Sequence, residues 1–536
     1  MDDQNPVQPV SPTQGEPTPS VGTPPVPPSS PFSGITIDLP QVTPASPEPQ
    51  PSEPAPADTY VVPATGTEVP PPQPGSSQPD NPFIPQGVAP ISAPPAPHGG
   101  SSMVRRLIMV LVFLFLAGIV FAGARFALGF LGGVKEVTIS YWGLWENESI
   151  IAPVISAFQV AHPKIKVEYV KQSPKQYRER LQAAITRGDG PDAFRFHNSW
   201  VPMLKNELAL VPKTTMTPAE FSSTFYPIAG ASLVAGSSIF GIPLEVDGLG
   251  LYYNEYLFAA AGVKVPTTWE EVLNVVPKLT VRTGDTITTS AIALGTWGNV
   301  EAASDILATM MLQNGANLVN PTGKEAEETL VFYRKFATPA DPVYTWNDTL
   351  DNSMYAFATG RVAMILAPSW RAFDIKQINP NLRFKIAPIP QLPGSTVTWA
   401  SFWVEGVSAK SKYPEQSWEF IKYLTSKEGA TKLYTEESKI RLFGEPYARV
   451  ELASTIADDP YAGAFIKQAT SAKTFPLASR TFDNGLNDKL IKYMEDGVNG
   501  LAAGSAPAAV LRTMSSGFQQ VLSQYGLVSA APPATQ

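Results

Sequence analysis

The residues best able to do chemistry stand where predicted strands end. Residues 137–141 alternate between apolar and polar side chains, and residues 193–196 follow a Gly/Asp/Pro turn; both patterns are typical of strands. Aromatic, amide, imidazole and carboxylate side chains follow directly: Trp142, Trp145, Glu146, His197, Asn198 and Trp200. Flat apolar faces beside fixed polar groups suit a sugar ring, because its C–H faces lie on aromatic rings while its hydroxyls form hydrogen bonds. These residues predict a ligand-binding cleft.

More candidates of the same kind lie in predicted loops, beside Gly, Asn, Ser or Pro. They are Glu245, Asp247, Trp297, Asn299, Trp370, Arg371, Trp399 and Trp403. Each tryptophan could equally pack in a core. Glu245 and Asp247 could form a solvated pair or bind vicinal hydroxyls, and Arg371 could clamp a ligand group or pair with Asp374. Taken together, the set predicts a cleft lined by aromatic faces, amides and carboxylates.

A catalytic centre has little support in the sequence. Outside the first 100 residues the histidines are His162, in a predicted helix-to-strand turn, and His197, the remaining candidate base. The chain contains no G-x-S-x-G, H-E-x-x-H, Walker or G-x-G-x-x-G motif. A glycosidase needs a pair of carboxylates, so a glycoside-processing enzyme stays as a weaker alternative. Its candidate carboxylates are Glu146, Glu148, Glu245 and Asp247. We predict a binding protein with no catalytic residue, metal or cofactor.

The first part of the chain differs in composition from the rest. Residues 1–100 hold 29 of the 55 prolines, nine acidic side chains and no Lys or Arg. Such a segment cannot bury enough apolar surface to offset its ordering entropy, which predicts a disordered, Pro-rich tail over residues 1–103. Since the whole chain has a formal charge of −8, the remaining residues are close to neutral. A neutral body argues against a nucleic-acid partner.

A transmembrane anchor is predicted at residues 104–133. Residues 107–124 are apolar and uncharged, and with the apolar residues that follow they exceed the roughly 20 residues that span a bilayer. Arg105 and Arg106 favour a cytoplasmic tail and an extracellular binding domain in the cell membrane. An A-x-A pattern after the apolar run also fits a cleaved signal that would start at Met103, and this alternative stays open. The chain has no cysteine, so neither a disulfide nor a lipid-modified cysteine is predicted.

Strand and helix patterns alternate after the apolar segment. Residues 151–158 and 177–185 carry apolar side chains at helical spacing, whereas residues 165–170 alternate as a strand does. This β-α-β-α-β rhythm predicts an α/β fold with a mainly parallel sheet. In such sheets ligands bind beyond the carboxyl ends of the strands, where the aromatic and polar candidates lie.

Several stretches, in a fixed order over residues 134–528, resemble the family 1 extracellular solute-binding proteins of ABC importers, including their sugar-binding members. The stretches are "VTISYWGLW", "IIAPVISAFQVAHPKIKVEYV", "GDGPDAF", "GIPLEVDGLGLYYNEYLFAAAGVKVPTTWEE", "AFATGRVAMILAPSW", "IAPIPQLPG" and "VSAKSKYPEQSWEFIKYLTSKEG". The sequence departs from the family at "TEESKIRLFGEPYARVEL", where many members carry a short Gly-x-x-Pro turn.

The resemblance implies a two-lobed, periplasmic-binding-protein-like fold that holds its ligand between two α/β lobes joined by crossing segments near "PLEVDG" and "APIPQLPG". The expected divisions are a tail at 1–103, an anchor at 104–133, lobe 1 at about 134–245 and 388–426, lobe 2 at about 246–387 and 427–528, and a flexible end at 529–536. It also implies a monomer that passes a small solute, a sugar or oligosaccharide, to the permease subunits of an ABC importer. A ligand-sensing or adhesion ectodomain would share this fold and remains an alternative.

Overall fold

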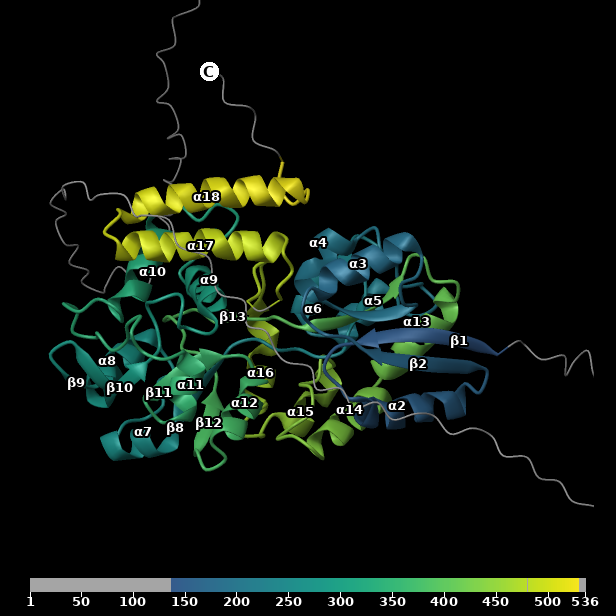
Figure 1. Ribbon diagram of the computed structural model, residues 1–536, viewed down its shortest axis with the longest axis horizontal. Coiled ribbons are helices and arrows are strands. Elements are labelled where there is room, and N and C mark those ends of the chain that lie inside the picture. The colour runs from purple at the N-terminus through teal and green to yellow at the C-terminus, as the bar shows by residue number, and fades with distance from the viewer. Residues whose placement is uncertain (1–135, 480, 530–536) are drawn as a thin grey trace, which may run out of the picture. The chain divides into compact units, whose positions relative to one another are not determined.

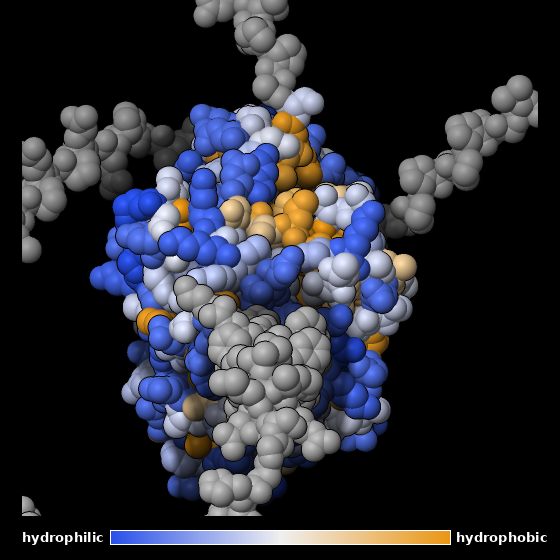
Figure 2. Space-filling model, turned by 90° about the vertical axis from the view of Figure 1, so that its right-hand side faces the viewer, coloured by the Kyte–Doolittle hydropathy of each residue, from blue (hydrophilic) through white to orange (hydrophobic). Residues whose placement is uncertain are grey.

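Two β-sheets organise the part of the chain that the structure, a computed structural model, describes: residues 136–479 and 481–529 (Figure 1). The predicted tail at residues 1–103 and the predicted anchor at residues 104–133 lie outside this part. Within it, no helix is both long and apolar enough to cross a membrane. The face shown in Figure 2 is largely hydrophilic, with apolar side chains gathered toward its upper part.

The first sheet has six strands in the order β2-β1-β3-β14-β4, with β7 paired to β14. The strands are β1 (Val137–Gly143), β2 (Ile165–Lys171), β3 (Ala193–His197), β4 (Leu208–Ala209), β7 (Ile242–Pro243) and β14 (Trp403–Ser408). The helices of this lobe are α2 (Glu148–Ala161), α3 (Tyr177–Arg187), α4 (Val201–Leu204), α5 (Pro218–Thr224), α6 (Pro227–Leu233), α13 (Pro414–Leu424) and α14 (Lys427–Ser438). Helix α2 packs on β2, and α13 packs on β14 and β1.

The second sheet has five strands in the order β12-β8-β11-β10-β9. The strands are β8 (Gly250–Asn254), β9 (Val281–Thr283), β10 (Thr286–Ile292), β11 (Val362–Ala367) and β12 (Phe384–Ala387). The helices of this lobe are α7 (Glu255–Ala261), α8 (Trp269–Leu279), α9 (Ala303–Gln313), α10 (Lys324–Lys335), α11 (Ser353–Ala358), α12 (Arg371–Ile378), α16 (Gly463–Gln468), α17 (Leu486–Ala502) and α18 (Pro507–Gln524). The C-terminal pair α17 and α18 lies against α9 and α10 (Figure 1).

Short elements complete the described part of the chain. They are β5 (Val234–Ala235), β6 (Ser238–Ile239), β13 (Thr398–Trp399), β15 (Ala472–Lys473), α15 (Ala453–Ile456), η1 (Asn198–Trp200), η2 (Val450–Leu452) and η3 (Ala469–Ser471).

The predicted parallel arrangement is present in the first sheet apart from β14, which runs against the other strands, whereas the second sheet is mixed. Strands β2 and β3 do run parallel to β1, as the β-α-β-α-β rhythm predicts. However, β14 is antiparallel to β3, β4 and β7, and in the second sheet β8 is antiparallel to β11 and β12. The reason is that β8 and β14 enter their sheets from segments that cross between the lobes, and not through a helix that returns the chain to the same edge.

The loop between β1 and α2 is held in place because the elements on both sides of it bury apolar faces. In β1, Ile139 and Tyr141 are buried on one face, at the period of two that predicted the strand. In α2, Ile151, Val154 and Phe158 are buried at helical spacing. The short loop between these elements therefore has little freedom, and it presents Trp145 at the end of the sheet.

The chain passes between the lobes at residues 244–249, 388–402 and 439–462. Isolated β-bridges tie the first of these segments to the other two. The backbones approach so closely that a Cβ added to Gly248 would lie 1.9 Å from the carbonyl oxygen of Trp399. A residue with a side chain at this position would therefore prevent the close contact between the crossing segments, so glycine is required there.

The position of helix α14 contradicts one predicted boundary between the lobes. The sequence predicts that residues 427–528 belong to the second lobe, but α14 packs against α2 and α13 of the first lobe. The chain reaches the second lobe later, since α16 contacts β12. The expected crossing stretches "PLEVDG" and "APIPQLPG" lie at the first two passages between the sheets.

Candidate ligand-binding site

A cleft of about 400 Å³ is lined by residues of both lobes and of the crossing segments. The predicted site residues that line it are Trp145, His197, Glu245, Asp247, Trp370, Arg371, Trp399 and Trp403. Trp145, His197 and Trp403 stand at the ends of first-sheet strands, whereas Trp370 follows β11 of the second sheet. Trp145 and His197 lie at the carboxyl ends of β1 and β3, where ligand sites of parallel sheets occur, whereas Trp403 was expected in a loop and is the first residue of the antiparallel β14.

Aromatic rings form one wall of the cleft. The Trp145 ring packs edge-on against Trp403, with 5.5 Å between ring centroids, and Trp403 lies 5.4 Å from the buried ring of Trp200. Trp145 is 39% exposed and Trp370, on the other lobe, is 38% exposed. Apolar faces of this size are usually covered in a folded protein, so two open tryptophans at one cleft indicate a surface for a ligand.

Arg371 is the first residue of α12 and stacks on its neighbour Trp370, with 4.0 Å from the guanidinium carbon to the ring centroid. Its guanidinium also forms ion pairs with Glu301 and Asp374, the latter at 2.5 Å. The pairing with Asp374 that the sequence left open is therefore present. Arg371 holds the Trp370 ring in place while its charge is already balanced.

Two acidic side chains of the first crossing segment form the floor of the cleft. The carboxylate of Glu245 accepts a hydrogen bond from the backbone N–H of Trp403 at 3.2 Å. Asp247 accepts hydrogen bonds from the N–H of Gly248 at 2.7 Å and from Ser369 Oγ at 2.9 Å. Burial raises the pKa of Asp247 to about 7, and burial together with Glu445 raises the pKa of Glu245 well above its usual range. The crossing segment is thus linked through Asp247 to the second lobe at Ser369.

His197 takes part as a neutral hydrogen-bonding group. Its Nδ1 lies 2.7 Å from Ser199 Oγ and its Nε2 lies 3.0 Å from Ser401 Oγ. Burial lowers the pKa of His197 to about 3, because a charged imidazolium would lose its hydration there. At neutral pH the ring therefore carries no charge into the cleft.

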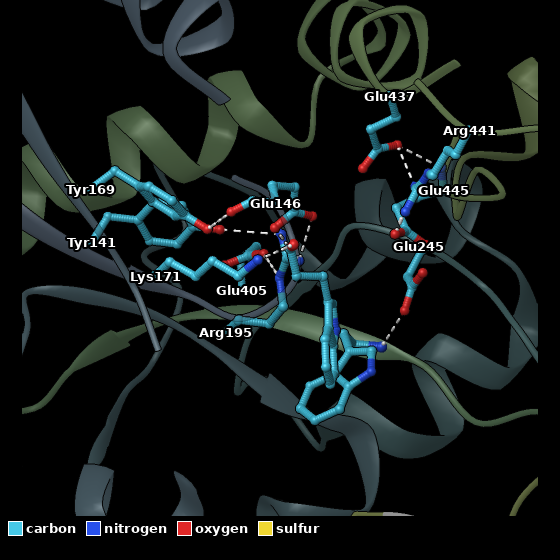
Figure 3. Close-up of polar contacts among 12 residues, drawn as sticks. Tyr141, Glu146, Tyr169, Lys171, Arg195, Glu245, Glu405, Glu437, Arg441 and Glu445 are labelled. Atoms are coloured by element: carbon cyan, nitrogen blue, oxygen red, sulfur yellow. Dashed lines mark hydrogen bonds and ion pairs between the residues drawn. The ribbon is translucent and has the colours of Figure 1, made fainter. Parts of the chain in front are cut away.

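Glu146 does not reach the cleft. It is buried behind the aromatic wall, where both of its carboxylate oxygens accept hydrogen bonds from Arg195 Nη1, at 2.6 and 2.9 Å (Figure 3). Arg195 Nε donates to Glu405 at 2.7 Å, and Arg195 Nη2 donates to the hydroxyl of Tyr141 at 3.3 Å. This buried triad joins the loop after β1 to β3 and β14, and so positions the neighbouring Trp145.

The other predicted residues outside the cleft have partners within the fold. They are Trp142, Asn198, Trp200, Trp297 and Asn299. Trp142 and Trp297 are partly buried against the core, and Trp200 is 1% exposed. Asn198 Oδ1 accepts from the N–H of Phe402 at 3.1 Å, and Asn299 Nδ2 donates to the carbonyls of Asn347 and Leu350 at 2.9 and 3.0 Å. A position next to a strand end therefore does not show whether a residue packs within the fold or contacts a ligand.

Arg441 and Glu445 line the cleft without having been predicted from the sequence. Arg441 Nη2 pairs with Glu437 at 2.8 Å and with Glu445 at 2.9 Å (Figure 3). Although burial favours the neutral acid, the Arg441 guanidinium holds the pKa of Glu445 down to about 2. Both residues lie in "TEESKIRLFGEPYARVEL", where the sequence departs from the family pattern, so no family motif indicated them.

Other lining residues likewise escaped sequence reasoning. They include Pro174, Asp305, Phe373, Ser401, Ser479, Thr481 and Phe482. Asp305 accepts from Trp399 Nε1 at 2.7 Å, across a separation of 94 residues. Spacing along the chain carries no signal for such a contact. The "TFDNG" turn around Phe482 was the one local feature that could have drawn attention.

Two α/β lobes joined by crossing segments around an aromatic cleft define the class of two-lobed binding proteins. The chain belongs to the bacterial extracellular solute-binding protein family, which it matches over residues 154–445. Membership in this family makes the chain a binding protein and not an enzyme.

Individual relatives are distant. The multiple sugar-binding protein of Streptococcus mutans is 23% identical over 329 residues, which cover 56% of this chain and 73% of that protein. The sugar-binding protein MalE of Xanthomonas citri has a similar structure, with a TM-score of 0.60 at 19% identity, covering 72% of this chain and 98% of the other. A cyclo/maltodextrin-binding protein solved with maltotetraose gives a TM-score of 0.58 at 18% identity, covering 73% and 98%. At these identities the structural likeness concerns the fold.

Proposed function

We propose that this protein captures a sugar or oligosaccharide between its lobes and delivers it to the permease subunits of an ABC importer. The observation that carries the proposal is the pair of open ring faces, Trp145 and Trp370, on opposite lobes of one cleft with carboxyl groups at its floor. Rings can stack on a sugar from both lobes while the carboxyl groups bind its hydroxyls. The Streptococcus relative named a multiple sugar-binding protein, and the fold neighbour solved with maltotetraose, support this direction.

Thermal unfolding of the purified full-length chain tests the binding part of the proposal. A panel of neutral monosaccharides and oligosaccharides is added one by one, with amino acids and short peptides as the comparison set. A ligand at 100 times its Kd should stabilise the protein by about 2.7 kcal/mol, which raises the midpoint of unfolding. Stabilisation by a peptide or amino acid, with none from any sugar, would refute the proposal.

Uptake by cells separates transport from sensing. A strain that lacks this gene should lose uptake of the sugar that binds in the panel, and the gene supplied in trans should restore it. Unchanged uptake would favour the alternative of a sensing or adhesion ectodomain.

We also propose that residues 104–133 anchor the protein in the cell membrane with the Pro-rich tail in the cytoplasm. The supporting features are the uncharged run at 107–124 and the preceding Arg105 and Arg106. Protease added to intact cells should digest the binding domain and leave the tail protected. A digested tail, or a mature chain that begins near residue 125, would contradict the anchor.

A further inference from the structure

The cleft holds more acidic than basic side chains. Its lining acids are Glu245, Asp247, Asp305, Asp374 and Glu445, and its lining bases are Arg371 and Arg441, apart from the neutral His197. Among the described residues, no lysine contributes to this lining. Although burial keeps a proton on Glu245 and raises the pKa of Asp247 to about 7, the lining has more acids available to face a ligand cation than bases to face an anion, and the low-dielectric walls of a cleft strengthen such charge interactions.

Both arginines are already engaged by carboxylates. Arg371 pairs with Glu301 and Asp374, and Arg441 pairs with Glu437 and Glu445. Glu301 and Glu437 lie behind the lining, so counting them increases the acidic excess. A carboxylate or phosphate on a ligand would therefore have to compete with existing ion pairs while facing the remaining acids.

Glu245 and Asp247 are held by neutral donors and by another acid. Glu245 accepts from the backbone of Trp403 and shares a hydrogen bond with the side chain of Glu445. Asp247 accepts from backbone N–H groups and from Ser369 Oγ. A positive group on a ligand would replace the proton that the buried Glu245 otherwise retains.

A further observation points the same way. The exposed faces of Trp145 and Trp370 are independent of the acids, and a cation is attracted to the face of an indole ring. Glu437, behind Glu445, adds no ligand contact, because it lies outside the lining and pairs with Arg441.

We infer that the cleft selects ligands by charge: it binds saccharides that carry a protonated amine more tightly than their neutral counterparts and excludes those that carry a carboxylate or phosphate. The inference rests on the proposed sugar-binding function and specifies its ligand class. The ammonium group lies near Glu245, Glu445 and Asp247, and the sugar ring stacks on the tryptophans.

Matched sugars test the inference by titration calorimetry on the full-length chain. Within each series the ring is kept and one substituent changes: glucosamine, glucose and glucuronic acid; galactosamine, galactose and galacturonic acid; and β-1,4-linked glucosamine oligomers beside cello-oligosaccharides of equal length. In the series that binds, the amine should bind at least about tenfold more tightly than the neutral sugar, the scale of an added ion pair and cation–aromatic contact. The uronic acid should show no binding at the highest concentration used.

Charge-removing variants locate the effect. Glu245→Gln, Asp247→Asn and Glu445→Gln should each reduce the preference for the amine to less than about threefold, with a smaller change for the neutral sugar. Glu168→Gln, at an exposed position of β2, is the control and should leave both affinities unchanged. Circular dichroism melting of each variant shows whether it folds, and the ratio of the two affinities stays informative if a variant is less stable.

The outcomes separate this inference from the proposed function. Neutral sugars that bind as tightly as their amines, or uronic acids that bind as well as neutral sugars, would overturn the charge selection and leave sugar binding intact. A panel in which no sugar of any charge binds would count against both, and the peptides and amino acids of the wider panel would then identify the ligand class.

Discussion

Trp145 and Trp370 are the residues whose role in binding can be separated most cleanly from a role in folding. Each keeps more than a third of its surface open, so replacing it with alanine removes a stacking face while leaving most core contacts in place. We expect Trp145→Ala and Trp370→Ala to weaken sugar binding by at least about tenfold, corresponding to roughly 1–3 kcal/mol, with little change in Tm. Calorimetric titration and thermal melting of the same samples measure both quantities.

Trp200 provides the matched contrast. Its ring lies behind Trp403 and is 1% exposed, so Trp200→Ala leaves a buried cavity and should lower the free energy of unfolding by about 3–5 kcal/mol. If Trp145→Ala and Trp370→Ala destabilise the protein to the same extent, these two rings belong to the core and the open-face argument fails for them.

The protonation of His197 and that of Asp247 have opposite effects on the stability of the folded protein. The pKa of His197 falls from 6.5 to about 3 on folding, so below pH 6.5 the unfolded chain binds a proton that the folded chain refuses, and stability is lost as the pH falls. The pKa of Asp247 rises from 3.8 to about 7, so between these values the folded chain binds the extra proton and stability is gained as the pH falls. Each contributes at most about 1.4 kcal/mol per pH unit, and the two largely cancel between pH 4 and 6.5.

Removing one of the two groups should reveal the other. Relative to the unmodified protein, His197→Gln should gain stability as the pH is lowered from 6.5 to 5, and Asp247→Asn should lose stability over the same interval. Urea denaturation at several pH values gives the difference directly. Groups that face Asp247, namely Glu245, Glu445 and Ser369, are unchanged in the His197 variant and cancel in the comparison. Parallel pH profiles for all three proteins would show that neither group titrates in this way.

A lining residue could be predicted from the sequence when a strand end, and not tertiary packing alone, brings it to the cleft. Trp145 and His197 follow the carboxyl ends of β1 and β3, and the order of strands and helices places such ends together. Glu445 and Asp305 arrive through a crossing segment and a helix, and their contacts are set by tertiary packing alone. Glu146 shows that a strand end can also mislead. Its position after β1 predicted a ligand contact, but its carboxylate pairs with the buried Arg195.

Strand β3 is tied to its neighbours by the buried Arg195. The guanidinium links Glu146 in the loop after β1 with Glu405 on β14, and burial raises the pKa of Glu405. Arg195→Met would leave two buried carboxyl groups without a counter-charge, and we expect the free energy of unfolding to fall by about 3–5 kcal/mol. Chemical denaturation at pH 7 measures this loss.

A double replacement tests whether the loss comes from the stranded charges. Adding Glu405→Gln to Arg195→Met removes one of the two uncompensated carboxylates, so part of the lost stability should return. An equal or larger loss in the double variant would mean that the triad acts through packing and not through charge.

The first elements of the first lobe were easier to predict than the assembly of the two lobes. Buried faces at the periods of strands and helices located β1, α2, β2 and α3, because each buries a continuous face against its own lobe. The direction of β14 and the lobe to which α14 belongs depend on how the crossing segments return the chain. Local periodicity contains no information about that return, which explains why the reversed direction of β14, the mixed second sheet and the position of α14 were not predicted.

Closure of the lobes on the ligand is the mechanism we expect to couple binding to transport. Aromatic faces stand on both lobes, so a ligand that contacts both binds the closed form better, and this difference in affinity shifts the population toward closure. Because the chain contains no cysteine, Lys164→Cys on the first lobe and Lys264→Cys on the second introduce the sole labelling sites for a spin-label distance measurement. A saturating sugar should shorten and narrow the distance distribution for this pair, whereas Lys164→Cys with Arg187→Cys, both on the first lobe, should give an unchanged distribution. A sugar that binds tightly while the inter-lobe distance stays constant would mean a rigid cleft. An importer would then have to recognise the bound ligand itself, since no change in the shape of the protein would report its presence.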